Sequence, residues 1–337
     1  MQSPINQKLF RLAQAHPPKS IIVGVLITGA SGFVGRALVK NFAQRPGVFV
    51  RSAVRRSHDS SPLINPVIVG NLGRETDWTS AVEGVNCVVH TAAQVNPGTR
   101  RKTTPHSEYH RVNVEGTIKL AEQAAAAGVR RFIFISTAKV LGERSATRQP
   151  LSEVAPYAPC DGYASSKMEA ELALLALAKH TSMEVVIVRP PMVYGLNAAG
   201  NFSALTKLLD RGIPLPIAGI KNLRSFLSID NLVDFIWKCT WHPAAANQIF
   251  HVCDGKDLAT PDLVRAIERS LKRPVYLFHC PEPVLRWGFK LLGRMDIHQR
   301  LYDSFQLDAV KAKNAMQWSP VVSLEEALLQ VTQEHKN

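Results

Sequence analysis

Tyr163 and Lys167 could form an acid/base pair. They lie four residues apart at the start of a helical pattern that runs to His180, so a helix places them on one face, one turn apart. A nearby ammonium favours the phenolate of a tyrosine, whose free pKa is about 10. The pair could therefore act as a general acid or base nearer neutral pH. The same spacing also fits a half-buried tyrosine and a solvated lysine on an ordinary amphipathic helix.

Polar side chains that could assist such a pair occur upstream of it. The apolar run 132–135 leads directly into Ser136 and Thr137, whose hydroxyls would stand at the carboxyl end of a central strand. Asn113 lies within a second segment of helical periodicity, 108–127. We expect these groups to surround one site.

Three glycines, Gly29, Gly32 and Gly35, follow the apolar run Ile21–Ile27 and precede a helical pattern. This spacing suits a dinucleotide: the first glycine permits a tight turn, the second lets a pyrophosphate approach, and the third lets the helix pack on the strand. The phosphates would meet the free N–H groups at the start of the helix. The alternative is an ordinary strand–loop–helix unit with a few glycines.

Apolar runs alternate with helical patterns over the first 190 residues, and they outline the strands and helices that carry these groups. We expect strands at 21–27, 48–54, 66–69, 86–90, 131–136, 184–188 and 248–253, with helices near 36–44, 76–83, 108–127, 163–180 and 229–240. This alternation predicts an α/β fold with a Rossmann-like doubly wound parallel sheet. Its ligand crevice should lie at the carboxyl ends of the strands.

After residue 190 the alternation weakens and prolines punctuate short elements, which predicts a smaller C-terminal lobe. We divide the chain into an N-terminal extension (1–19), a Rossmann domain (20–190 with about 225–255) and the lobe (191–224 and 256–337).

The composition is that of an ordinary globular protein, with 46% hydrophobic and 20% charged residues. A net charge of +13 raises the question of nucleic-acid binding. The basic residues are scattered, however, without a basic helix or an aromatic platform, so we expect no nucleic-acid partner. A positive balance equally suits an enzyme whose cofactor and substrate both carry diphosphates.

No apolar run reaches the ~18 residues that a membrane span needs, and the first residues make a poor secretory signal. We therefore expect a cytoplasmic protein with no membrane partner. The five cysteines lie far apart without a C-x-x-C pair, so we expect neither a disulfide framework nor a metal site.

The motifs together resemble those of the extended short-chain dehydrogenase/reductase family, which contains nucleotide-sugar epimerases, dehydratases and reductases. The resemblance covers roughly residues 21–330 and rests on TGASGFVG, HTAA, NVEGT, ISTAKVLGE, YASSK and RPPMVYG. It implies a Rossmann-like domain and a C-terminal lobe that binds a sugar nucleotide. The sequence looks most like a branch near UDP-glucose 4-epimerase.

The resemblance also implies roles for individual residues. Tyr163 is the acid/base, Lys167 meets the nicotinamide ribose, and Asn113 supports the active-site helix. Thr137 binds the sugar hydroxyl or ketone, and Ser136 could share that role. The implied cofactor contacts are Gly29, Ser31, Gly32, Phe33, Val34, Gly35, Arg55, Asn71, Leu72, Thr91, Ala92, Ala93, Lys167, Pro190 and Val193.

In the lobe, four residues resemble the family's contacts to the nucleotide part of the substrate. Asn201 falls in the loop that meets the diphosphate, and Arg224 and Arg300 resemble the diphosphate-binding arginines. Asp303 is spaced to take a ribose hydroxyl. Each of them alone could be an ordinary surface residue.

The sequence departs from the family pattern directly after the catalytic threonine. Dehydratases of the family carry an Asp-Glu pair there, whereas this chain has Ala138 and Lys139, which argues against 4,6-dehydration. Lys139 is either a solvated residue at the strand end or a contact to a substrate carbonyl or phosphate.

A second departure concerns the cofactor. An acidic residue should end the second strand if NAD is preferred, but the chain has Arg55 and Arg56 there. A guanidinium can pair with a 2′-phosphate through its planar fork. We therefore favour NADP, with NAD possible and a basic loop without a ligand as the alternative. Asn71 replaces the family's usual Asp near the adenine.

We predict NAD(P)-dependent oxidoreduction at C4 of a UDP-linked hexose or N-acetylhexosamine, as a 4-epimerase or a 4-keto reductase in the synthesis of surface polysaccharide. The alternative is a non-catalytic NADP-binding regulator or a nucleic-acid-binding protein on the same fold. An intact set of Thr137, Tyr163 and Lys167 weighs against that alternative.

We also predict a homodimer. The family commonly pairs the helices near 108–127 and 163–180, and the second helix carries an apolar surface that one core cannot easily bury on every side. That surface consists of Leu172, Leu174, Leu175 and Leu177.

Overall fold

The structure is a computed structural model, which describes residues 23–56, 63–95, 104–196, 198, 201–271 and 274–333. The N-terminal extension expected at 1–19 lies outside these ranges.

Seven parallel strands form the main sheet, in the order β3-β2-β1-β4-β5-β6-β9. They are β1 (Val23–Thr28), β2 (Val48–Val54), β3 (Pro66–Ile68), β4 (Cys87–His90), β5 (Arg131–Ile135), β6 (Glu184–Arg189) and β9 (Gln248–His251). The near-continuous apolar sequence of β1, β4 and β5 fits their burial on both faces of the sheet. The chain runs outward from β1 to β3 and returns to β4 beside β1, so the topological switch point lies between β1 and β4.

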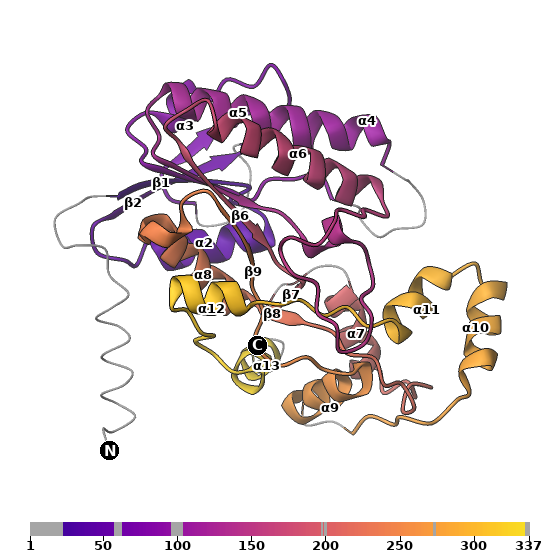
Figure 1. Cartoon of the computed structure of the whole chain (residues 1–337). Helices are drawn as coiled ribbons and strands as arrows, with labels where there is room; N and C mark the ends of the chain where they lie inside the picture. The colour runs from indigo at the N-terminus through magenta and orange to yellow at the C-terminus, as the bar shows by residue number, and fades with distance from the viewer. Residues whose placement is uncertain are drawn as a thin grey trace.

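Helices cover both faces of this sheet, so the expected doubly wound Rossmann-like fold is confirmed (Figure 1). One face carries α2 (Phe33–Phe42), α8 (Ile229–Trp241) and α12 (Val310–Met316). The other carries α3 (Thr79–Val82), α5 (Gly116–Ala126) and α6 (Gly162–Ala178). Short elements complete this part: α4 (His106–Tyr109), the π-helix η1 (His110–Glu115), and the 3₁₀ helices η2 (Ala138–Leu141) and η3 (Pro243–Ala245).

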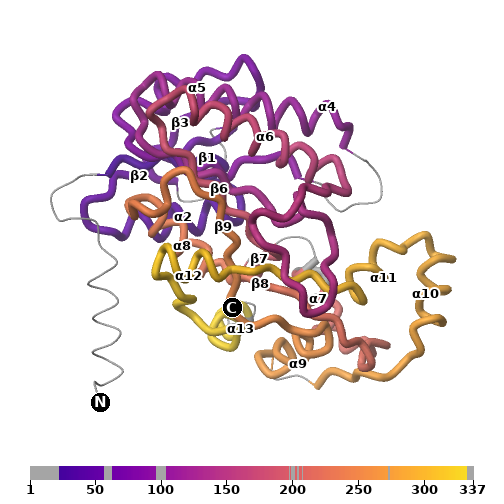
Figure 2. Tube along the Cα trace, viewed as in Figure 1, coloured from indigo at the N-terminus to yellow at the C-terminus, as the bar shows by residue number. Residues whose placement is uncertain are grey.

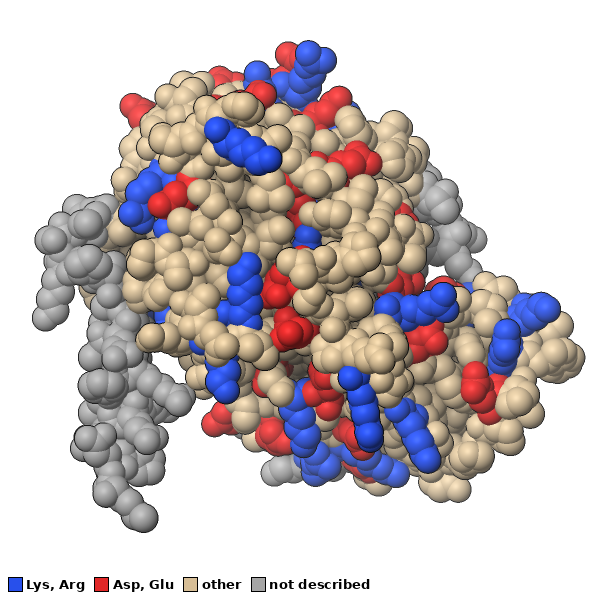
Figure 3. Space-filling model, in the orientation of Figure 1, with Lys and Arg blue, Asp and Glu red and all other residues tan. Residues whose placement is uncertain are grey.

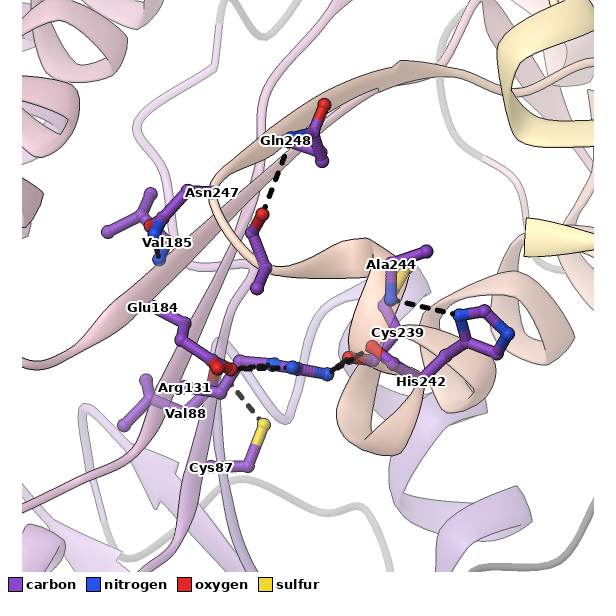
Figure 4. Close-up of polar contacts among 11 residues, drawn as sticks. Cys87, Val88, Arg131, Glu184, Val185, Cys239, His242, Ala244, Asn247 and Gln248 are labelled. Atoms are coloured by element: carbon purple, nitrogen blue, oxygen red, sulfur yellow. Dashed lines mark hydrogen bonds and ion pairs between the residues drawn. The ribbon is translucent and has the colours of Figure 1, made fainter. Parts of the chain in front are cut away.

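Arg131 fastens the end of α8 to the sheet (Figure 4). Its guanidinium donates to Glu184 Oε2 and also to the backbone oxygens of Cys239 and His242, at 2.6 and 2.9 Å. Because Arg131 is only 1% exposed, this charge is compensated by direct contacts within the protein.

The second lobe is built on a two-stranded parallel sheet of β7 (Met192–Tyr194) and β8 (Phe226–Ser228). Around it lie α7 (Asn201–Asp210), α9 (Thr260–Leu271) and α13 (Leu324–Gln333), which share a separate apolar core. Two further helices, α10 (Glu282–Leu291) and α11 (Met295–Tyr302), extend from this lobe away from the main sheet (Figure 1). None of the helices in the described part of the chain is both long and apolar enough to cross a membrane.

The C-terminal part of the chain departs from the expected division, which assigned 256–337 to the lobe. The trace returns to the main sheet at α12 (Figure 2). Ala312, Met316 and Trp318 join the core beneath α8, and the Trp318 ring lies edge-on to Phe235 at 5.2 Å between centroids. These residues lie far from α8 in the sequence, so no local sequence pattern predicts the contact.

Candidate active site

Two glycines around the turn after β1 have no room for a side chain. Gly29 has a φ of +65°, and a Cβ there would lie 2.8 Å from the backbone of Ala92. A Cβ on Gly35 would lie 2.1 Å from the carbonyl oxygen of Gly29. Gly32 caps α2 without a side chain, and no described side chain fills its place. Gly29 and Gly35 thus allow strand, turn and helix to pack closely, whereas the exposed Gly32 leaves the start of α2 open, which fits a dinucleotide pyrophosphate.

A buried chain of hydrogen bonds runs from β1 toward the helix of Tyr163. Thr28 Oγ1 lies 2.7 Å from His90 Nδ1, and His90 Nε2 lies 2.9 Å from Thr117 Oγ1. Thr117 donates its hydroxyl proton to the backbone oxygen of Asn113, so it must accept from His90 Nε2–H. Burial and the charge of Lys167 lower the pKa of His90 to about 3, which keeps the ring neutral.

Asn113 continues this chain from the π-helix η1. Its amide exchanges hydrogen bonds with the backbone of Gln94, and its Nδ2 also donates to Ser166 Oγ at 2.9 Å. Ser166 in turn donates to the backbone oxygen of Tyr163 at 2.8 Å. The side chain of Asn113 thus reaches the first turn of α6 through one hydroxyl.

The helix α6 carries a column of functional groups on one side. The N-cap of α6 is Asp161, whose Oδ1 accepts a hydrogen bond from the N–H of Ala164 at 2.7 Å. Tyr163, Lys167 and Glu171 follow at intervals of four residues. Tyr163 is half-buried, and the other two are buried.

Lys167 has an unusual environment for an ammonium group. Its Nζ lies 4.0 Å from the centroid of the Phe134 ring, which provides a cation–π contact. Burial lowers the pKa of Lys167 to about 7, although the carboxylate of Glu171 one turn further on opposes the shift. Lys167 can therefore change its protonation state near neutral pH.

The pKa of Tyr163 is raised in this structure, whereas the sequence predicted that the nearby Lys167 would lower it. Burial raises the pKa of this phenol, and the negative charge of Asp161 and the neighbouring Tyr109 raise it further. The Tyr109 and Tyr163 rings lie edge to face at 6.4 Å. In this structure Tyr163 is therefore a neutral phenol, the form that a general acid requires.

The two candidate hydroxyls after β5 face different surroundings. Ser136 is buried and donates to Glu171 Oε1. Thr137 is half-buried, and within the described ranges its hydroxyl accepts only a weak local hydrogen bond, from the N–H of Lys139 at 3.3 Å. The Ser136 hydroxyl is therefore used in a buried contact, whereas the Thr137 hydroxyl is available for a ligand.

Glu171 belongs to a buried ion pair that the sequence analysis missed. Arg189, at the end of β6, donates to it from Nη2 at 2.6 Å and from Nε at 3.0 Å. Tyr157 donates to the same carboxylate at 2.8 Å. An acidic residue one turn beyond Lys167 on an apolar helix, with an arginine ending the next strand, was the available signal.

Lys139 was left open between a solvated residue and a substrate contact, and the structure gives it two carboxylate partners. Its Nζ lies 2.7 Å from Asp161 Oδ2 and 2.7 Å from Glu143 Oε1. Burial alone would lower the pKa of Lys139, but these two hydrogen bonds outweigh it and raise the pKa. The same contact, with the Ala164 N–H, lowers the pKa of Asp161 despite burial.

The structure brings three of the lobe residues close to this cluster. Arg224 Nη1 donates to the backbone oxygen of Asp303 at 2.8 Å, and the Arg224 guanidinium lies 5.6 Å from the centroid of the Phe305 ring. Burial lowers the pKa of Arg224, opposed by Asp303 and Glu143. Arg300 also acts electrostatically on Asp161 and Arg224. Arg300 thus acts on the N-cap of α6, and Arg224 acts near Glu143, the other partner of Lys139.

The remaining candidates are spread around the switch point. Arg55 and Asn71 are exposed near the ends of β2 and β3, and Leu72 is half-buried beside Asn71. Thr91 donates to the backbone oxygen of Thr28 at 2.6 Å. Ser31, Phe33, Val34, Ala93 and Val193 are half-buried, whereas Pro190 is buried. The side chain of Asn201 lies outside the described part of the structure.

Comparison with known proteins gives the same family. Residues 25–253 match the NAD dependent epimerase/dehydratase family. The chain is 42% identical to a UDP-glucose 4-epimerase of Vibrio cholerae, over 94% of this chain and 95% of that one. It is 28% identical, over 80% of each chain, to the N-acetyl-alpha-D-glucosaminyl-diphospho-ditrans,octacis-undecaprenol 4-epimerase of Escherichia coli O157:H7. The fold matches UDP-glucuronic acid 4-epimerase from Bacillus cereus in complex with NAD, with a TM-score of 0.73 at 19% identity over 93% and 99% of the two chains.

The chain therefore belongs to the NAD-dependent epimerase/dehydratase family, as the motifs predicted, and it is an enzyme. This sets aside the alternative of a non-catalytic regulator or nucleic-acid-binding protein.

Proposed function

We propose that this enzyme carries out oxidoreduction at C4 of a UDP-linked hexose or N-acetylhexosamine, as a 4-epimerase or a 4-keto reductase. The observation that carries the proposal is the position of Tyr163 on a helix capped by Asp161, with Arg224 and Arg300 nearby. An acid/base group next to fixed positive charge suits a sugar that is linked to a diphosphate. The names of the Vibrio cholerae and Escherichia coli relatives, both 4-epimerases, support this reaction.

In this proposal, a bound nicotinamide cofactor would supply the acceptor, and later the donor, of the C4 hydride. As the phenolate, Tyr163 takes the proton of the C4 hydroxyl while the ketone forms. As the neutral phenol, it gives the proton back when the hydride returns to the opposite face of the sugar. Thr137 holds the same oxygen by a hydrogen bond. Lys167 meets the nicotinamide ribose, and its positive charge favours the phenolate when Tyr163 acts as the base. Asn113 positions α6 through Ser166.

The cofactor would lie across the turn after β1, where the exposed Gly32 leaves the start of α2 without a side chain. We assign its phosphates to the N-terminus of α2, with Ser31, Phe33 and Val34 around them, and its adenine to the edge formed by Asn71 and Leu72. The nicotinamide end would pass the small residues Thr91, Ala92 and Ala93 toward Pro190 and Val193.

Arg224 and Arg300 would bind the substrate diphosphate, with Asp303 and Asn201 as further contacts. The substrates named for the two 4-epimerases share a hexose on a diphosphate. Dehydration is disfavoured, because Lys139 is held between Glu143 and Asp161 in the place where dehydratases carry their acid pair.

We also propose NADP as the preferred cofactor, which favours a second candidate reaction, net reduction of a UDP-4-keto-6-deoxy sugar. Arg55 follows β2 where an acidic residue would bind NAD, and the described part of the chain gives it no carboxylate partner. NADPH is kept reduced and exchanges freely, which suits net reduction. A retained cofactor, usually NAD, suits epimerisation.

A homodimer through α5 and α6 remains our proposal, with a place in surface-polysaccharide synthesis in the cytoplasm. Less of the apolar surface on α6 is exposed than the sequence suggested. Leu174 lies in the core, Leu175 and Leu177 are half-buried against it, and only Leu172 of the four is exposed.

Two incubations separate the candidate reactions. Purified enzyme with UDP-GlcNAc and no added cofactor should form UDP-GalNAc if the enzyme is an epimerase. A UDP-4-keto-6-deoxy sugar should oxidise NADPH stoichiometrically if it is a reductase. A 4-keto-6-deoxy product formed from a plain UDP-hexose would contradict both.

A further inference from the structure

The helix α10 presents an apolar surface that no described part of the chain covers. Val284, Trp287 and Leu291 follow one another at i, i+3 and i+7, so they share one face. Trp287 and Leu291 are each 67% exposed and Val284 is 58% exposed. Single exposed apolar residues are common, but a helix with no buried residue and a tryptophan at the centre of its exposed face is not explained by packing.

The contacts of this helix with the protein lie on its other side. Leu285 and Phe289 are half-buried, and the Phe289 ring meets His298 of α11 at 6.2 Å. The pair α10 and α11 stands out from the lobe as an arm (Figure 1). The apolar face therefore does not hold the arm in place.

Basic residues border the apolar face on one side. Arg286 and Lys290 are both exposed, and each neighbours Trp287 or Leu291 in the sequence. Neither has a carboxylate within salt-bridge distance in the described ranges, whereas Arg294 pairs with Asp296 at 3.2 Å. Elsewhere on the visible face, Lys and Arg alternate with Asp and Glu (Figure 3). Within the described residues, the arm therefore carries two cations without an ion-pair partner directly beside its exposed tryptophan.

We propose that this surface, formed by Val284, Arg286, Trp287, Lys290 and Leu291, binds an anionic lipid bilayer. A helix that lies in a bilayer interface inserts its apolar face, places tryptophan at the headgroup level, and directs Lys and Arg to lipid phosphates. A second copy of the chain would suit the apolar residues, but the net charge of +13 opposes self-association through a cationic face. The proposed contact is peripheral, so it needs no helix that crosses the membrane.

Flotation of the full-length protein with vesicles tests this surface. We expect the protein to float with phosphatidylcholine vesicles that contain phosphatidylglycerol, to stay behind with phosphatidylcholine alone, and to be released by salt. Near an anionic surface each cation is worth about 1 kcal/mol, so Arg286→Ser with Lys290→Ser should weaken partition about 30-fold. Trp287→Ser with Leu291→Ser should abolish flotation.

The matched control is Val154→Ser with Val310→Ser, which removes two other exposed apolar side chains and should leave flotation unchanged. Unchanged thermal unfolding and unchanged turnover of a water-soluble nucleotide sugar show that each variant is folded. Equal flotation of wild type and of both arm variants would overturn the proposal. So would light scattering in which the Trp287→Ser, Leu291→Ser variant changes from dimer to monomer, because the surface then faces a second copy.

Discussion

Lys139 and Asp161 form a 2.7 Å ion pair that joins the end of β5 to the N-cap of the helix carrying Tyr163. Asp161 therefore makes two contacts, because one carboxylate oxygen caps α6 and the other accepts a hydrogen bond from Lys139 Nζ. Its charge also raises the pKa of Tyr163. A residue that replaces half of the dehydratase acid pair thus acts on the proposed acid/base through the helix cap.

Replacing Lys139 should change the pH profile more than the binding of substrate. In Lys139→Met, the charge of Asp161 is less compensated and raises the pKa of Tyr163 further. The rise of kcat/KM with pH should then move to higher pH, with about tenfold lower activity below the shifted midpoint for each unit of displacement. Lys139→Arg should restore the profile, and Lys179→Met, at the far end of α6, should leave it unchanged. A Lys139→Met profile that superposes on wild type would exclude this role.

Removing the Tyr163 hydroxyl tests the proposed acid/base. Tyr163→Phe should lower turnover by about 10²–10⁴-fold while cofactor binding is retained. Tyr109→Phe is the matched control, because its ring packs against Tyr163 without belonging to the proposed chemistry. Near-normal turnover of Tyr163→Phe on the true substrate would refute the assignment.

Substitution should distinguish the roles of the two hydroxyl groups that follow β5. Thr137→Val should reduce kcat by about 10²-fold, because a hydrogen bond to the reacting oxygen is lost. Ser136→Ala should keep most turnover and instead lower the free energy of unfolding by about 1.5–3 kcal/mol, since Glu171 loses a donor. Steady-state kinetics and urea unfolding of both variants measure the two effects. The reverse pattern would move the catalytic role to Ser136.

Cofactor preference should depend on Arg55. We expect wild type to bind NADP more tightly than NAD, and Arg55→Ala to lose roughly 10- to 100-fold in NADP affinity with NAD affinity little changed, because a charge-assisted hydrogen bond is worth about 1.5–3 kcal/mol. Arg130→Ala, at the opposite end of the sheet, serves as the control. Titration of both cofactors gives the answer, and equal or tighter binding of NAD by wild type would end the NADP proposal.

Stability of the cofactor-free enzyme should rise with pH through Lys167. Burial lowers its pKa from 10.5 to about 7, so between these values the unfolded chain binds a proton that the folded protein does not. The free energy of unfolding should therefore increase from about pH 7 toward about pH 10. Lys167→Gln should reduce this slope in urea unfolding, whereas Lys179→Gln should not. An identical slope in both variants would show that Lys167 is not the group responsible.

The sheet and its helices were predictable because their signals are local. The apolar run before Gly29 and the helical period after Tyr163 each lie within a single element. What sequence analysis missed depends on contacts between elements. Glu171 pairs with Arg189, which lies 18 residues further along the chain. Trp318 packs under α8, and its indole N–H donates to Asp234, which lies 84 residues earlier.

The pKa of Tyr163 was misjudged for a related reason. Spacing on a helix indicates which charges are near, but not how deeply a phenol is buried, and burial is the larger cause. The exposed face of α10 was equally hidden, because an amphipathic pattern alone does not show which side the protein covers.

The column of Tyr163, Lys167 and Glu171 on α6 restricts how this stretch of the chain can change over time. Deleting or inserting one residue between them would rotate everything beyond it by about 100°. Glu171 would then leave Arg189 and Ser136, and its charge would be buried without partners. This helix can accept substitutions on its outer side, but its length between Asp161 and Glu171 is fixed to the residue, unlike the surface turns elsewhere in the protein.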